Sequence, residues 1–218
     1  NTHPKIHKYE DTLRLCYHGS YTHISKFYPH LINAINQLSS ETNVELHLIT
    51  NPFNLGNIAD NFPKTKVIHK HWNIKTFMSD VLSCDVGIVP NVTDLTPRIP
   101  QLNQQTSVNE GLYSTDYNFR MKNKSNAGRA FVFHQLGLPV VADLTPSHVH
   151  IMGNPDCGYL VNDWEGWYKA FVNLLDFNTR NTISQNAHRV FNREYNEKIW
   201  AQSLIRKLKS IKNEKVQE

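Results

Sequence analysis

The sequence predicts an α/β fold: a Rossmann-like, doubly wound parallel sheet with helices on both faces, followed by further helices at the C-terminus. The main observation is that apolar runs of strand length alternate along the whole chain with stretches of helical apolar spacing. A second is the composition, since 39% hydrophobic and 11% aromatic residues over 218 positions are typical of a folded globular chain. The third is that no internal repeat and no linker divides the chain.

The first ninety residues are expected to supply four strands and two helices. The strands are predicted over 13–17, 44–50, 67–69 and 86–89, the last of them ended by Pro90. Between the first two strands, residues 24–38 carry apolar side chains at helical spacing. A short amphipathic helix is expected over 76–83.

Residues 91–121 interrupt this alternation. They are rich in Asn, Gln, Thr, Ser and Pro and show no periodicity, which is typical of a functional loop or a mobile segment. The alternation resumes with a helix over 127–136, a turn at Gly137, and strands over 139–142 and 159–161. Three helices are expected to follow, beginning at Trp164 and covering about 179–192 and 196–212.

The composition narrows the class of partner. Positive residues exceed negative ones by four charges, which suits an anionic small ligand or a weak attraction to an acidic membrane surface and is too small to indicate nucleic acid. The three cysteines (Cys16, Cys84 and Cys157) form neither a disulfide framework nor a zinc pattern, so we expect a cytoplasmic protein. The sequence contains neither an apolar run of the roughly 20 residues that a membrane helix needs nor a signal peptide.

The chain begins at Asn1, without a methionine, in a polar stretch. We therefore expect residues 1–12 to be a leader or linker, residues 13–218 to be a single domain, and the whole to be a piece of a longer protein.

The strongest candidate for a binding site is the basic cluster before the 127–136 helix. It comprises Lys122, Lys124, Ser125, Asn126 and Arg129. Cations and small polar residues at a helix start favour an anion, because the unpaired N–H groups and the helix dipole already attract negative charge. Two ammonium groups and a guanidinium could neutralise a diphosphate. The alternative is a solvated basic face.

Two turns at strand ends are further candidates. Gly19 and Ser20 follow the first strand, where glycine lets the backbone approach a ligand and the hydroxyl can bind it, although an ordinary capped turn would look the same. The loop at 143–148 follows the 139–142 strand, and loops at that edge face the ligand crevice of such sheets.

After the third strand comes a segment with histidines and Trp72. Trp72 could stack on a base or cap the core. The histidines lack partnering carboxylates or cysteines, so no metal is expected.

A dinucleotide fingerprint is absent after the first strand, which argues against classical NAD binding. No nucleophilic triad can be assembled, because Ser147 and His148 are merely adjacent in sequence.

Taken together, these segments resemble the C-terminal half of GT-B-fold glycosyltransferases, and in particular the retaining, glycogen-synthase-like superfamily of bacterial surface-polysaccharide enzymes. The resemblance rests on the Gly-Ser turn, CDVGIVP at 84–90, the basic cluster, QLGLPVVAD at 135–143 and GYLVNDWEGW at 158–167. It covers about residues 13–208.

The resemblance implies a glycosyltransferase that binds a nucleoside-diphosphate sugar here and a saccharide acceptor mostly through a separate N-terminal domain, with no metal or other cofactor. It implies that Gly19 and Ser20 lie near the phosphates, that Lys124 and Arg129 hold the diphosphate, and that 68–72 borders the base. The complete set of expected donor-binding residues is Gly19, Ser20, Trp72, Pro90, Lys122, Lys124, Ser125, Asn126, Arg129, Thr145, Pro146 and Ser147; no catalytic residue is assigned.

One departure from the family pattern stands out. The family often carries two glutamates eight positions apart, and counting back from Gly137 those places hold Lys124 and Val132. Either Lys124 holds phosphate in a divergent subgroup or the donor site is altered.

Other functions remain to be weighed. A non-catalytic, flavodoxin-like binding or regulatory module is the main alternative, and another nucleotide-sugar enzyme such as an epimerase is a third. The basic residues of the last helices suit peripheral contact with the inner face of a membrane, with a solvated helix face as the plainer alternative.

Overall fold

A single parallel sheet organises the chain in the computed structural model, which describes residues 3–21, 24, 27, 29–51, 56–91, 127–195 and 197–214. The described strands are β1 (Thr12–His18), β2 (Asn43–Thr50), β3 (Lys66–His71), β4 (Val86–Val89), β5 (Val140–Asp143) and β6 (Gly158–Val161). Their order in the sheet is β3-β2-β1-β4-β5-β6, and every neighbouring pair is parallel. The predicted fold class is confirmed.

The strand order places the direction switch of the sheet at β1 and β4. The chain moves outward from β1 to β3 on one side, then returns to start β4 beside β1 and moves outward again to β6. Leu15 of β1 pairs with Val86 of β4 in this junction. In open parallel sheets the loops that leave two such strands diverge, and the crevice expected between them lies at the carboxyl ends of the strands.

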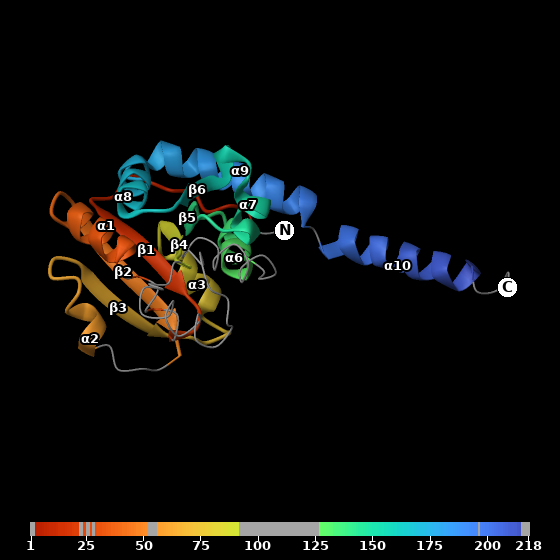
Figure 1. Ribbon diagram of the computed structural model, residues 1–218, viewed down its shortest axis with the longest axis horizontal. Coiled ribbons are helices and arrows are strands. Elements are labelled where there is room, and N and C mark those ends of the chain that lie inside the picture. Colours follow the sequence, from red (N-terminus) through yellow and green to blue (C-terminus); the bar gives the residue numbers. More distant parts are fainter. Residues whose placement is uncertain are drawn as a thin grey trace, which may run out of the picture.

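Helices cover both faces of the sheet (Figure 1). Helices α1 (His30–Ser39) and α8 (Trp164–Asn173) pack on one face, and α3 (Phe77–Leu82), α6 (Gly128–Leu136) and α7 (Pro146–Met152) pack on the other. Successive strand residues point to opposite faces, so Leu15 and Tyr17 join the first layer while Cys16 joins the second.

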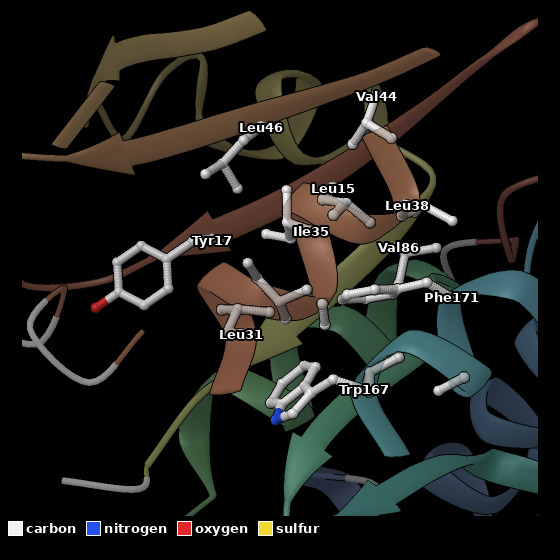
Figure 2. Packing of buried hydrophobic residues seen from close by; sticks show 14 of the residues in the cluster. Leu15, Tyr17, Leu31, Ile35, Leu38, Val44, Leu46, Val86, Trp167 and Phe171 are labelled. Atoms are coloured by element: carbon white, nitrogen blue, oxygen red, sulfur yellow. The ribbon is translucent and has the colours of Figure 1, made fainter. Parts of the chain in front are cut away.

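The core of the first layer forms where α1 and α8 meet over β1 and β2. Figure 2 shows Trp167 and Phe171 of α8 directed toward Leu31 and Ile35 of α1, with Leu15 of β1 drawn next to Ile35. All five side chains are essentially fully buried. Burial of one such side chain contributes about 1.5–3 kcal/mol, so this contact anchors α8 and with it the end of the sheet that carries β5 and β6.

The two helices at the C-terminus behave differently. Helix α9 (Phe177–Glu194) packs against α6, whereas α10 (Glu197–Glu214) extends away from the body (Figure 1). Six large apolar side chains of α10 are exposed: Ile199, Trp200, Leu204, Ile205, Leu208 and Ile211. Within the described residues, no helix combines the length and apolar character needed to span a bilayer.

Several predicted boundaries change. The helix expected over 24–38 begins only at His30, because Pro29 at its N-cap lacks the N–H that a helix interior requires. Strand β3 continues to His71, since its backbone pairs with β2 along its full length although its last residues are polar. Two short elements were not predicted, helix α2 (Gly56–Ala59) and the 3-10 turn Pro155–Cys157. The loop expected over 91–121 lies outside the described residues beyond Asn91.

The segment that precedes β1 packs on the domain. The N–H of Lys5 donates to the carbonyl of Leu136, and the ammonium of Lys5 pairs with buried Asp85 at 3.1 Å. His7 is buried as well, with its Nε2 atom 3.0 Å from the Ser184 hydroxyl. These contacts lie at the amino end of β4, opposite the crevice.

Candidate functional site

The candidate site lies at the carboxyl edge of the sheet, around the switch between β1 and β4. Open parallel sheets bind ligands at this position because the loops diverge there. Gly19 and Ser20 follow β1, Pro90 and Asn91 follow β4, and the first turn of α6 brings Arg129 to the same place.

Gly19 is required by the geometry of the loop after β1. Its φ of 137° is a conformation that side chains rarely adopt, and its N–H donates to the carbonyl of Ile49 at 3.2 Å. A Cβ atom here would lie 3.3 Å from the Tyr17 hydroxyl oxygen and 3.5 Å from Cδ of Arg129. The Tyr17 hydroxyl in turn donates to the carbonyl of Ser20 at 2.9 Å. The glycine thus lets the backbone lie close to Arg129.

Arg129 is the second residue of α6, a helix without a side-chain cap at Ala127. Its guanidinium lies 5.5 Å from the centre of the Tyr17 ring, a cation–π distance. Its Nη2 atom donates to Oδ1 of Asn91 at 3.4 Å, while its Nη1 atom is buried and makes no hydrogen bond. Burial lowers the pKa of Arg129, and Tyr17 and Asp143 raise it; arginine stays charged at neutral pH. The site therefore contains a cation with an unsatisfied donor, which is costly unless an anion accepts from it.

His18 holds the first turn of α6 against the end of β1. Its ring makes edge contacts with Phe77 and Phe133, and its Nε2 atom lies 3.4 Å from the carbonyl oxygen of Arg129. Burial lowers the pKa of His18 to about 4. The ring is therefore neutral at physiological pH and adds no charge beside Arg129.

The residues after β5 form a helix start, where a loop was expected. Thr145 is buried at the N-cap of α7, and Pro146 is the first helical residue, a position at which proline fits because the N–H there has no partner in the helix. The prediction of a loop over 143–148 was therefore wrong beyond Thr145. The hydroxyl oxygens of Thr145 and Ser147 lie 3.2 Å apart.

Trp72 lies at the same edge but further along it. It directly follows β3, and its N–H donates to the carbonyl of Thr50 at 2.8 Å. Its side chain is 41% exposed and its ring lies 6.3 Å from that of Phe77, so it is not a core residue. Strand β3 is two places from β1, which puts Trp72 about 10 Å away from the end of β1. Residues 68–71, expected to border a base, belong to the strand itself.

Four of the expected site residues, Lys122, Lys124, Ser125 and Asn126, lie outside the described residues. Val132, where the family pattern places an acid, packs against the apolar cluster shared by α3, α6 and α7. Within the described ranges, no group of three or more His, Cys, Asp or Glu side chains is arranged to hold a metal ion.

Sequence reasoning missed two residues of this site, Tyr17 and Asn91. Tyr17 was assigned to a strand and Asn91 to an irregular segment, yet both lie at the carboxyl ends of the switch strands. That position was the available signal, since the ends of β1 and β4 meet in any doubly wound sheet of this order.

Comparison with solved structures identifies the fold. TarM matches over 94% of this chain, with a TM-score of 0.64 and 11% sequence identity. The C-terminal domain of LpcC, a glycosyl transferase group 1 family protein from Francisella tularensis, matches over 84% of the chain with a TM-score of 0.54 and 12% identity. This chain has the fold of a C-terminal GT-B domain.

The matches cover very different shares of the proteins compared. This chain covers 37% of TarM but 86% of the LpcC domain. It also covers 98% of the catalytic domain of cholesterol-alpha-glucosyltransferase from Helicobacter pylori, with a TM-score of 0.56 and 14% identity. No protein-family model matches the sequence, and no curated protein matches it. The fold is thus recognisable from the structure at identities too low for sequence comparison.

Proposed function

We propose that this chain is the donor-binding half of a glycosyltransferase, which binds a nucleoside-diphosphate sugar in the crevice between β1 and β4. The observation that carries the proposal is the buried Nη1 atom of Arg129, a guanidinium donor without a hydrogen bond at the switch point. A diphosphate would supply the missing acceptor, and a guanidinium can bind phosphate oxygens in pairs. The N-terminus of α6, where Ala127 supplies no side-chain cap, adds a favourable dipole.

The structural neighbours support this ligand class. TarM from S. aureus was solved in complex with UDP, Fondaparinux and alpha-GlcNAc-glycerol, and HepE from Anabaena with UDP and glucose. HepE matches over 92% of this chain with a TM-score of 0.54. The main alternative, a flavodoxin-like regulatory module, is not favoured, because the neighbours are glycosyltransferases.

The chemistry proposed for this half is electrostatic. During transfer, the bond between the anomeric carbon and a diphosphate oxygen breaks, and its electron pair stays on that oxygen. The acceptor hydroxyl forms the new bond to the sugar and gives its proton to the leaving diphosphate. Arg129 would stabilise the charge that grows on the leaving diphosphate, so that the proposed mechanism requires no metal.

The remaining expected residues are assigned by their place along the edge. Gly19 and Ser20 would lie beside the phosphates, Lys124 would share the diphosphate charge, and Trp72 at the end of β3 would border the base. The start of α7, with Thr145 and the following Pro146 and Ser147, would lie near the phosphate or sugar on the β5 side.

The acceptor is proposed to be a saccharide of a surface polysaccharide, bound mostly by a separate N-terminal domain. Two observations support this: the chain covers only 37% of TarM, and WaaG, a glycosyltransferase involved in lipopolysaccharide biosynthesis, matches over 85% of this chain with a TM-score of 0.52. Transfer would then require that second domain, whereas nucleotide binding would not.

Isothermal titration of the 218-residue chain with UDP, GDP and ADP tests the proposal. We expect one of them to bind, and Arg129→Ala to weaken it by about 10- to 100-fold, the usual range for a hydrogen-bonded charge. Arg189→Ala, which removes an arginine from the exposed side of α9, is the matched control and should change nothing. Lys124→Ala should also weaken binding. Absence of binding by all three nucleotides, or unchanged affinity of Arg129→Ala, would refute the proposal.

A peripheral contact with an anionic membrane is proposed for α10. Its exposed apolar side chains share the helix with five cations, Lys198, Arg206, Lys207, Lys209 and Lys212, a combination typical of helices that lie in the membrane interface. Sedimentation with phosphatidylglycerol vesicles should carry down the chain, and Leu204→Glu with Leu208→Glu should abolish this. Equal sedimentation with neutral vesicles, or none at all, would exclude the anionic surface as the partner.

A further inference from the structure

A chain of buried polar groups runs from β5 to Arg129. The imidazole of His148 on α7 has Nδ1 2.7 Å from the carbonyl oxygen of Asp143 and Nε2 3.3 Å from Nδ2 of Asn91. Asn91 then accepts from Nη2 of Arg129 through Oδ1 at 3.4 Å. His148, Asn91 and Asp143 are 2%, 6% and 1% exposed. Because solvent hardly reaches these groups, the hydrogen bonds among them constrain which atom donates and which accepts.

The roles follow from the carbonyl of Asp143. A carbonyl only accepts, so Nδ1 of His148 must carry the proton and donate to it. In the neutral ring Nε2 is then an acceptor, and it takes a hydrogen from the amide nitrogen of Asn91. The other end of that amide, Oδ1, must therefore face Arg129. The ring of His148 thus holds the Asn91 amide in the orientation that the guanidinium, which only donates, also requires.

The backbone of Asn91 is held by the Asp143 side chain. Oδ2 of Asp143 accepts from the N–H of Asn91 at 2.5 Å, and Oδ1 accepts from Nε1 of Trp167 at 3.1 Å. Trp167 is itself 1% exposed in the core under α8. Asn91 is therefore tied through Asp143 to the rigid core of the domain.

We propose that Asn91 and His148 are positioning residues that aim Arg129 at the donor diphosphate. Asn91 occupies Nη2 of Arg129 and leaves Nη1, which makes no hydrogen bond, for the ligand. A hydrogen-bond acceptor on one side of the guanidinium fixes the plane of the guanidinium. Because the acceptor is a neutral amide, the positive charge of Arg129 stays available to the ligand, whereas a carboxylate in this place would neutralise that charge. The proposal rests on the proposed function, in which Arg129 binds the diphosphate.

A double-mutant cycle on the 218-residue chain tests the role of Asn91. Its readout is the affinity for whichever of UDP, GDP and ADP binds in the titration proposed for the function. In the wild-type background, Asn91→Ala should weaken binding about five-fold, the equivalent of about 1 kcal/mol. In the Arg129→Ala background the same substitution should change affinity by less than about two-fold, because a positioning residue has nothing left to position. A purely structural role would cost the same in both backgrounds.

Paired substitutions of His148 keep the test decisive if Asn91→Ala does not fold. His148→Gln can place an acceptor oxygen near the position of Nε2 and should retain most of the affinity. His148→Phe keeps an aromatic ring without an acceptor and should lose about five-fold. His150→Ala, an exposed histidine on the same helix, is the control and should bind like the wild type.

The outcomes distinguish a failure of the proposed nucleotide binding from a failure of the positioning role of Asn91 and His148. If Arg129→Ala leaves affinity unchanged, the proposed function fails, and the positioning role fails with it. If Arg129→Ala weakens binding but Asn91→Ala does not, or weakens it equally in both backgrounds, only the positioning role is overturned. Equal affinities of His148→Gln and His148→Phe would overturn the part assigned to His148.

Discussion

Replacement of Gly87 by alanine should show how closely the helix that carries Arg129 packs on the sheet. Gly87 lies in β4 at the direction switch, and a Cβ atom built there would be 2.4 Å from both Cγ and Cδ2 of Phe133. Carbon atoms in contact need at least about 3.5 Å, so the ring must retreat by about 1.1 Å. Phe133 is fully buried on α6, one turn after Arg129, so the ring can retreat only by displacing its neighbours.

The expected cost follows from this overlap. Overpacking of a closed core costs about 1–3 kcal/mol. A loss of 2 kcal/mol would lower the Tm by about 4–8 °C for a chain of this size. Because α6 must move, nucleotide affinity should fall as well, although Gly87 itself is buried beneath the crevice. Urea unfolding, calorimetry and nucleotide titration of Gly87→Ala would measure the three effects.

A second substitution isolates the cause. Phe133→Leu alone should cost about 1–2 kcal/mol through the space it leaves, but in the Gly87→Ala background it should cost much less or stabilise the fold. Gly166→Ala on α8 is the control, since its Cβ would meet side-chain atoms at 3.1–3.3 Å and should change stability by less than about 1 kcal/mol. A Gly87→Ala variant as stable as the wild type, or additive costs for the pair, would refute the packing argument.

Two further predictions concern ionisable groups. Burial lowers the pKa of both His18 and His134 to about 4, so the unfolded state, with a histidine pKa near 6.5, binds more protons between pH 6.5 and 4. The free energy of unfolding should therefore decrease as the pH is lowered from 6.5 to 4, by up to about 1.4 kcal/mol per pH unit for each histidine. His18→Phe should remove about half of this slope in urea unfolding, and an unchanged slope would contradict the assignment. Asp85→Ala should cost about 3 kcal/mol, because it removes the carboxylate that pairs with the part-buried ammonium of Lys5 and leaves that ammonium only the Cys84 carbonyl. The exposed Asp156→Ala is the comparison, and equal stability of the two variants would count against a structural role for Asp85.

The strands could be predicted from the sequence because their signal is local. β4 was predicted with the bounds that the structure has, and β1 and β2 within one residue at each end. Gly137 also ends α6 as expected, with a φ of 73° that favours glycine. Elements whose boundaries depend on pairing or capping were placed less well, such as β3, whose polar end is held by hydrogen bonds to β2.

The candidate site could be predicted only in part. Gly19, Pro90 and Arg129 were chosen for their place next to predicted strands and a predicted helix, and the structure places all three at one edge. Asn91 also follows a predicted strand but was not chosen, because its hydrogen bond with Arg129 joins residues 38 positions apart.

The sequence alone determined the elements and their approximate order, and with them the α/β class, because apolar periodicity and glycine turns act over a few residues. The tertiary structure decided which strand ends are neighbours. With β1 beside β4, Tyr17, Asn91 and Arg129 meet, whereas Trp72 lies two strands away. Only that arrangement shows that Nη1 of Arg129 is buried without an acceptor, since satisfaction of a hydrogen-bonding group depends on contacts between distant segments.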